Sequence, residues 1–214
     1  MSKVAIKICG IRDPDMAKEA VLAGADFIGI IFHPPSKRCV SIAQATDIAS
    51  AVKAQGAKPV AVFVDHSSEQ MAQICQETDI QMVQLQSDRA KSQHHRLPAD
   101  YRRIYVQSVA ANGRLDPDEA GGLSYCHPIR DYLLFDNREG GKGQPFNWEA
   151  FHYQGTFPWG LAGGLTVDNV KIALKKYPLA LVDVSSGVEN AHGEKDKALI
   201  RQFIYTVRQA GDIG

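Results

Sequence analysis

A cysteine followed directly by a glycine stands near the start of the chain, at Cys9 and Gly10. The mostly apolar, β-branched residues at 4–8 predict a buried strand that ends at the cysteine. Gly10 allows a sharp turn, and Asp13 then predicts the N-cap of a helix over Pro14–Ala23. The Cys9 sulfur would lie at the mouth of a site, near a helix N-terminus that favours its thiolate. A lone cysteine is more often a small apolar core residue, so the rest of the chain must decide.

An aspartate and an arginine follow other apolar runs. Asp136 comes directly after residues 132–135, so we expect its carboxyl to be partly desolvated. Burial raises the pKa of a carboxyl, and Asp136 could then donate a proton near neutral pH. A loop aspartate that caps the next segment is the alternative. Arg38 could hold a carboxylate in a bidentate pair, although a solvated surface arginine fits its loop equally well.

Two short loops suit an anion. Gly163 and Gly164 would let the backbone approach a ligand closely, while Ser185, Ser186 and Gly187 would offer backbone amides and two hydroxyls. A helix N-terminus after each loop would add a favourable dipole. Either loop alone could be an ordinary turn. Because they follow the last two apolar runs, the two together predict a phosphate site.

Eight short apolar segments alternate with amphipathic segments along the chain, and the candidate site residues lie at or just after the ends of several of the apolar segments. Such alternation predicts a parallel α/β sheet, and eight units fit a closed (βα)8 barrel, which takes roughly 200 residues or more. An open doubly wound sheet is the competing fold, but the glycine-rich turn that normally follows its first strand is missing here. No linker divides the chain, so we expect one domain over residues 1–214. The segments are 4–8, 26–32, 59–64, 80–85, 103–106, 132–135, 159–162 and 179–184.

Composition narrows the class of protein. Lys plus Arg and Asp plus Glu number 24 each, so the net charge gives no reason to expect nucleic acid or a membrane as a partner. No apolar run approaches the roughly 18 residues that span a bilayer, and the start of the chain does not resemble a signal peptide. The four cysteines are widely spaced, which disfavours a disulfide framework or a structural zinc site. A reduced, cytoplasmic protein is expected.

Taken in order, these motifs resemble the phosphoribosylanthranilate isomerase family of tryptophan synthesis. The resemblance spans almost the whole chain and implies a (βα)8 barrel with no cofactor and no metal. It also implies an Amadori rearrangement of N-(5-phosphoribosyl)anthranilate to 1-(2-carboxyphenylamino)-1-deoxyribulose 5-phosphate. The matching stretches are residues 7–11, 24–26, 29–32, 36–38, 62–64, 83–85, 140–143, 161–165 and 182–189, with Phe146 and Trp148.

The family's roles carry over onto matching positions. The resemblance implies that Asp136 protonates the ribose ring oxygen and that Cys9 then removes the C2 proton. Such a pair predicts a bell-shaped pH–rate profile, with the base setting the acid limb and the acid setting the alkaline limb. Arg38 would hold the anthranilate carboxylate, and Asp183 would contact the sugar. A small phosphorylated substrate is the implied partner, and family members are monomers or homodimers.

The chain departs from the family pattern at several positions without losing a proposed catalytic group. Gln86 stands where the family usually has a histidine, so no charged role is possible there. Gln107 lies where the pattern often runs through Lys-Ala, and Asn137 follows the aspartate. Lys142 replaces a threonine in a glycine-rich loop, and Asn147 replaces an aspartate.

Three other functions remain open on the residues alone. A barrel like indole-3-glycerol phosphate synthase needs a catalytic lysine, for which Lys7 is the candidate in the first strand. A barrel like ribulose-phosphate epimerase needs a metal site, near which only His33, Asp65 and His66 lie. A barrel that binds a phosphorylated ligand without catalysis would need neither Cys9 nor Asp136.

Overall fold

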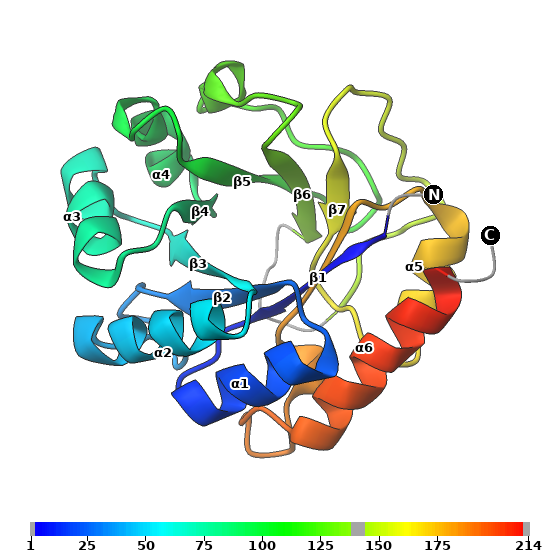
Figure 1. The fold of residues 1–214 in the computed structure, drawn as a ribbon. Coiled ribbons are helices and arrows are strands. Elements are labelled where there is room, and N and C mark those ends of the chain that lie inside the picture. Colours follow the sequence, from blue (N-terminus) through cyan, green and yellow to red (C-terminus); the bar gives the residue numbers. More distant parts are fainter. Residues whose placement is uncertain (1–2, 138–143, 212–214) are drawn as a thin grey trace.

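The computed structural model describes residues 3–137 and 144–211 of the chain (Figure 1). Its strands are parallel and close into a barrel in chain order, with the first strand beside the last. The predicted (βα)8 barrel is confirmed, and the open doubly wound sheet is excluded. The strands are β1 (Ala5–Cys9), β2 (Phe27–Ile31), β3 (Lys58–Phe63), β4 (Met82–Leu85), β5 (Arg102–Val109), β6 (Tyr132–Asn137), β7 (Trp159–Leu161) and β8 (Leu181–Val184).

Helices cover the outside of the barrel, and polar residues cap several of them. The Asp13 side chain accepts the Met16 amide at 2.8 Å, as expected for the N-cap of the first helix. Ser41 and Ser67 form capping boxes at the next two helices. The α-helices are α1 (Pro14–Ala23), α2 (Ile42–Ala54), α3 (Ser68–Thr78), α4 (Asp88–Gln93), α5 (Val170–Lys176) and α6 (Lys197–Gly211), with 3-10 helices η1 (His94–Arg96), η2 (Gly122–Tyr125) and η3 (Ser186–Val188). None of these described helices is long and apolar enough to cross a membrane.

The alternation of strand and helix is incomplete after β5 and β6. Residues 110–131 contain only η2, and the described residues 144–158 contain no helix. Aromatic packing covers the barrel here instead. Phe151 and Tyr153 lie against Phe135 of β6 with ring centroids 4.9 and 5.0 Å away, and Phe151 is fully buried. Large rings bury enough apolar area to replace a helix at this side of the sheet.

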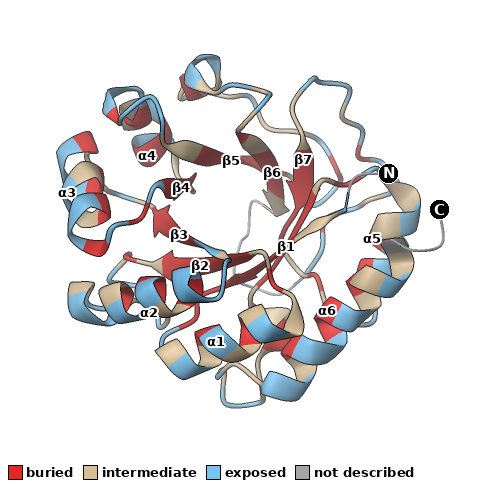
Figure 2. Ribbon diagram, in the orientation of Figure 1, coloured by how far each residue is buried: buried red, intermediate tan, exposed pale blue. Residues whose placement is uncertain are grey.

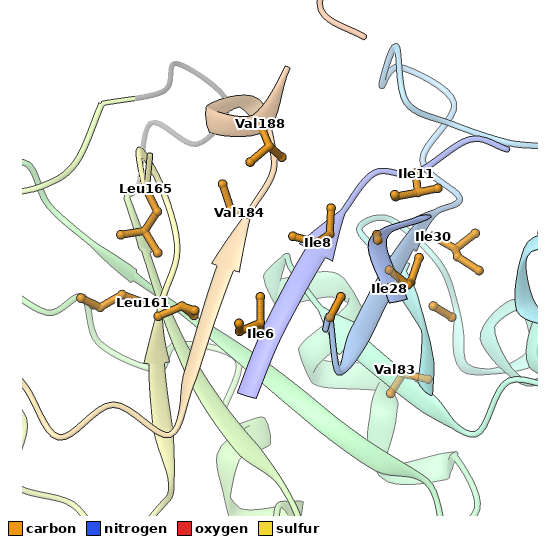
Figure 3. Close-up of a cluster of buried hydrophobic side chains, with 14 of the residues drawn as sticks. Ile6, Ile8, Ile11, Ile28, Ile30, Val83, Leu161, Leu165, Val184 and Val188 are labelled. Carbon is orange, nitrogen blue, oxygen red and sulfur yellow. The ribbon is translucent and has the colours of Figure 1, made fainter. Parts of the chain in front are cut away.

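The strands of the barrel are mostly buried (Figure 2), and successive side chains along each strand point alternately outward and inward. Ile6 and Ile8 of β1 belong to the outer apolar layer with β2 residues such as Ile28, as Figure 3 shows. Leu134 and Leu181 belong to a smaller cluster inside the barrel. Polar side chains with the same inward parity occupy the carboxyl ends of the strands, where they form the site described next.

Candidate active site

A cavity of about 210 Å³ opens at the carboxyl ends of the strands. It contains eight of the nine residues that the sequence singled out for a site. Gly187 is the exception: a Cβ there would overlap the carbonyl oxygen of Leu165, so this glycine serves close packing of η3 against the loop after β7. The predicted residues that line the cavity are Cys9, Arg38, Asp136, Gly163, Gly164, Asp183, Ser185 and Ser186.

Cys9 faces the barrel interior beside Lys7, two residues earlier on the same strand. A Cβ on Gly29 of β2 would stand 2.7 Å from Cys9 Sγ and 3.0 Å from Lys7 Nζ. The sulfur and the ammonium therefore both pack against the Gly29 backbone, close to each other. Burial raises the pKa of Cys9, while Lys7 lowers it and Asp183 raises it again. The net direction is upward, opposite to the thiolate expected from the helix N-terminus. The buried ammonium of Lys7 is the group that favours the thiolate.

Lys7 and Asp183 form a buried ion pair beneath the cavity. Lys7 Nζ donates to both carboxylate oxygens of Asp183 at 3.0 Å, and the lysine is fully buried. Although burial opposes the charge, Asp183 and then Cys9 raise the pKa of Lys7 above its ordinary value. Lys7 is therefore a fixed cation below the Cys9 sulfur. Asp183 lines the cavity, and its contact with a sugar stays a prediction.

Asp136 ends the inward-facing row of β6. Its Oδ2 accepts a hydrogen bond from Gln86 Nε2 at 3.1 Å. Burial raises the pKa of Asp136 to about 6, against a lowering by the Gln86 hydrogen bond and with a further rise from Asp183. The upward shift expected from the preceding apolar run is confirmed. A carboxyl with this pKa can hold and release a proton near neutral pH.

Arg38 already holds a carboxylate of this chain. Its Nε and Nη2 donate to Glu189 at 2.5 and 2.8 Å, and Lys195 donates to the same carboxylate at 2.8 Å. Burial opposes the charge, yet hydrogen bonds from Arg38 and Lys195 lower the pKa of Glu189 to about 2. Gly10 makes room for this arrangement, since a Cβ there would stand 2.5 Å from Arg38 Cδ. The predicted bidentate pair exists, but its partner in this structure is Glu189.

The two predicted anion loops follow the neighbouring strands β7 and β8, and both line the cavity. Gly163 and Gly164 have φ values of +72° and +77°, which side chains rarely tolerate. A Cβ on Gly164 would collide with the backbone of residues 144–145, so this glycine accommodates protein rather than leaving space for an anion. η3 follows Ser185 directly, where the sequence suggested an ordinary helix N-terminus.

The two serines differ in how they are held. Ser185 Oγ donates to the Cys9 carbonyl at 3.0 Å and accepts from Lys195 Nζ at 3.2 Å, so it ties β8 to β1. Ser186 lines the cavity at the start of η3. We therefore expect the two hydroxyls to have different tasks.

Sequence reasoning assigned no task to Gln84 or Glu189, and it considered Lys7 only as the catalytic lysine of an alternative barrel. Their signal was the period of two along strands, since Lys7 precedes Cys9 by two residues and Gln84 precedes Gln86 by two. Glu189 lay within a matching motif but had no assigned task. Within residues 3–137 and 144–211, no three His, Cys, Asp or Glu side chains are grouped so as to hold a metal ion. The matching stretch 140–143, with its one departure at Lys142, lies outside the described residues.

Comparison with known proteins gives consistent results. The family model described as N-(5'phosphoribosyl)anthranilate (PRA) isomerase matches residues 6–206. A curated relative from Chlamydia caviae, N-(5'-phosphoribosyl)anthranilate isomerase, is 38% identical over 212 residues, which cover 97% of this chain and 98% of the relative.

Solved structures agree with these sequence matches. Monomers generated from the dimeric phosphoribosylanthranilate isomerase of Thermotoga maritima superpose with a TM-score of 0.76 at 29% identity, over 96% of this chain and 99% of theirs. A phosphoribosyl anthranilate isomerase in complex with reduced 1-(o-carboxyphenylamino)-1-deoxyribulose 5-phosphate has a TM-score of 0.71 at 28% identity, with the same coverage.

Proposed function

The chain belongs to the N-(5'-phosphoribosyl)anthranilate isomerase family of tryptophan biosynthesis, and we propose that it uses Cys9 as general base and Asp136 as general acid. The reaction is the Amadori rearrangement of N-(5-phosphoribosyl)anthranilate to 1-(2-carboxyphenylamino)-1-deoxyribulose 5-phosphate, an aldose–ketose isomerisation. The observation that carries the assignment is that Cys9 and Asp136 line one cavity, with β7 and β8 between their strands in the barrel order.

Proton transfers by Asp136 and Cys9 begin the rearrangement. Asp136 donates its proton to the ribose ring oxygen while the C1–O bond breaks, and the anthranilate nitrogen lone pair forms a C1=N iminium. The iminium makes the C2 proton acidic. The Cys9 thiolate removes that proton, the C2–H electrons form C1=C2, and the C=N electrons return to nitrogen. The resulting enol then takes a proton at C1 and releases its hydroxyl proton, which leaves the ketone at C2. Protons enter at the ring oxygen and C1 and leave from C2 and the C2 hydroxyl, so no atom is gained or lost.

The remaining site residues bind the ends of the substrate. The Gly163–Gly164 turn and the Ser185–Gly187 turn present backbone amides to the phosphate, which needs no metal for charge neutralisation in this scheme. Arg38 engages Glu189 through Nε and Nη2, so its Nη1 is the donor assigned to the anthranilate carboxylate. Asp183 contacts the sugar while it holds Lys7 in place.

All residues in this scheme come from one chain. A monomer therefore carries a complete site, and a homodimer would carry two. We place the protein in the cytoplasm, because its four cysteines are free thiols and a reducing compartment preserves them. Residues 1–214 are taken as one domain.

The serine loop provides a graded test of the phosphate assignment. Ser186→Ala should raise KM about fivefold at unchanged kcat, because one hydrogen bond to the phosphate is lost. Ser185→Ala should lower kcat as well, because its hydroxyl bonds the Cys9 carbonyl. Steady-state kinetics on N-(5-phosphoribosyl)anthranilate separates the two. Equal effects of both substitutions on kcat would contradict the division of tasks.

Metal independence separates this mechanism from an epimerase-like one. Dialysis against a strong chelator should leave turnover of N-(5-phosphoribosyl)anthranilate unchanged, because the scheme moves protons between side chains and substrate only. The assay compares dialysed enzyme with and without added zinc or magnesium. Loss of activity that returns with either metal would overturn the proposed chemistry.

A further inference from the structure

Two glutamine side chains connect strand β4 to Asp136. Gln84 lies within β4, and Gln86 follows it with the same inward parity. Gln84 Nε2 donates to Gln86 Oε1 at 2.9 Å, and Gln86 Nε2 donates to Asp136 Oδ2 at 3.1 Å. The Gln86 backbone is fixed as well, since its amide donates to the Phe63 carbonyl at 2.9 Å. The three side chains form one continuous row of hydrogen bonds.

The direction of this row follows from Asp136. Asp136 Oδ2 accepts from Gln86, so Gln86 turns its NH₂ group toward Asp136 and its oxygen toward Gln84. Gln84 must then present its own NH₂ group to Gln86. The Gln84 oxygen therefore points away from both partners.

That oxygen is buried and lacks a partner. Gln84 is only 3% exposed, and its Oε1 makes no hydrogen bond within the described residues. Buried polar atoms are nearly always satisfied, and an unsatisfied one at a ligand cavity points to the ligand. Gln84 lines the same cavity as Cys9 and Asp136.

Resting on the proposed function, we infer that Gln84 is a substrate-binding residue whose Oε1 accepts a hydrogen bond from a ribose hydroxyl, and that Gln86 is a positioning residue that couples this contact to Asp136. The substrate is a polyol, so it brings O–H donors to an acceptor that the protein leaves unpaired.

The same row fixes the orientation of the Asp136 carboxyl. Gln86 donates to Oδ2, and the backbone amide of Asn137 also hydrogen-bonds this carboxyl. A Cβ on Gly163 would stand 2.5 Å from Oδ1, so the absence of a side chain there lets the predicted phosphate loop pack closely against the carboxyl. An amide cannot titrate, so Gln86 orients the acid without competing for its proton.

Substitution of Gln84 tests the substrate contact. Gln84→Leu should raise KM about fivefold, because one hydrogen bond to the substrate is lost. Its thermal midpoint should change little, because the substitution removes an unsatisfied buried oxygen but also the donor of Gln86 Oε1. Gln81→Leu is the matched control, since Gln81 is exposed just before β4 and outside the cavity. An unchanged KM in Gln84→Leu, or a KM increase of the same size in the control, would overturn the contact.

Substitution of Gln86 tests the coupling to Asp136. The pKa of Asp136 is measured without substrate, from the ¹³C shift of its carboxyl in labelled protein, with Asp136→Asn identifying the resonance. Gln86→Leu removes a hydrogen bond to the ionised Asp136 carboxylate, so the pKa of Asp136 should rise from about 6 by about one pH unit. Because the carboxyl also loses the contact that orients it, kcat should fall about tenfold at similar KM. Gln86→Glu should raise the pKa of Asp136 further through like charge.

The other charged groups that act on Asp136 are Lys7 of β1 and Asp183 of β8, with Cys9 and Arg38 across the cavity, and all remain in each variant. A carboxyl that titrates alike in the parent and in Gln86→Leu would overturn the coupling. Failure of the parent enzyme to turn over its substrate would instead overturn the proposed function. The carboxyl titration is independent of turnover, so the two failures are distinguishable.

Discussion

Cys9→Ala is expected to lower kcat by about 10² to 10⁴-fold, the usual loss on removing a general base. The substitution deletes the sulfur that we propose takes the C2 proton. It leaves the Lys7–Asp183 pair in place, so the charge of the cavity floor is retained. Binding of a product analogue should therefore stay nearly unchanged. Steady-state kinetics together with calorimetric titration of the analogue measures both quantities.

A second cysteine provides the matched control for that experiment. Cys75 lies in α3 and is 1% exposed, so Cys75→Ala makes the same change in the core away from the cavity. It should lower the thermal midpoint without lowering kcat. If Cys9→Ala kept more than half of the parent kcat, the sulfur would not be the base.

Asp136→Asn should cause a comparable fall in kcat with little change in KM. Asparagine keeps the shape of the side chain and an oxygen for Gln86, but it has no acidic proton to give to the ring oxygen. The kinetics should be followed over a range of pH, both for Asp136→Asn and for the double variant Asp136→Asn/Asn137→Asp. That variant restores a carboxyl next to the original position, so recovered activity there would show that only a nearby acid is needed, contrary to the assignment.

The pH dependence of kcat/KM follows from the order of two pKa values. Burial raises the pKa of Asp136 to about 6, and burial raises the pKa of Cys9 above its ordinary value despite Lys7. The productive form of the enzyme combines a protonated Asp136 with an ionised Cys9. At a pH between the two pKa values most molecules have the opposite arrangement, and the productive form is a small, constant fraction. kcat/KM should therefore rise up to about pH 6, remain level, and fall above the Cys9 pKa.

This order corrects the assignment expected from the sequence. The limb near pH 6 belongs to the acid, and the alkaline limb belongs to the base. The phosphate of the substrate has its second pKa at about 6 as well. A limb near pH 6 that persists in the residual activity of Asp136→Asn would belong to that phosphate and would contradict the assignment to Asp136.

The sequence was most informative where the signal is local. Short apolar runs located all eight strands, and Asp13 located the start of α1, because both depend on neighbours within a few residues. Once the barrel is assumed, strand ends converge at one face, so Cys9, Asp136 and the two loops could be grouped without coordinates.

Features that depend on distant residues could not be predicted in the same way. Lys7 and Asp183 are 176 residues apart, and Arg38 and Glu189 are 151 apart. Both pairings depend on barrel closure and on side-chain direction, neither of which a local pattern contains. The pKa of Cys9 was misjudged for the same reason, because the burial that raises it comes from the whole barrel. Aromatic cover after β6 likewise replaced an expected helix.

The closure of the barrel also sets when the site can exist during synthesis. β1 pairs with β8, Lys7 bonds Asp183, and Ser185 bonds the Cys9 carbonyl, so early residues are completed by late ones. A ribosome that adds about 5–20 residues per second releases Cys9 roughly 9 to 35 seconds before residue 183. Over that interval a nascent chain has Lys7 and Cys9 but lacks the Asp183 carboxylate that pairs with Lys7 and the Ser185 hydroxyl that bonds the Cys9 carbonyl. The arrangement of the site is therefore completed only once β8 has been made, after the other seven strands.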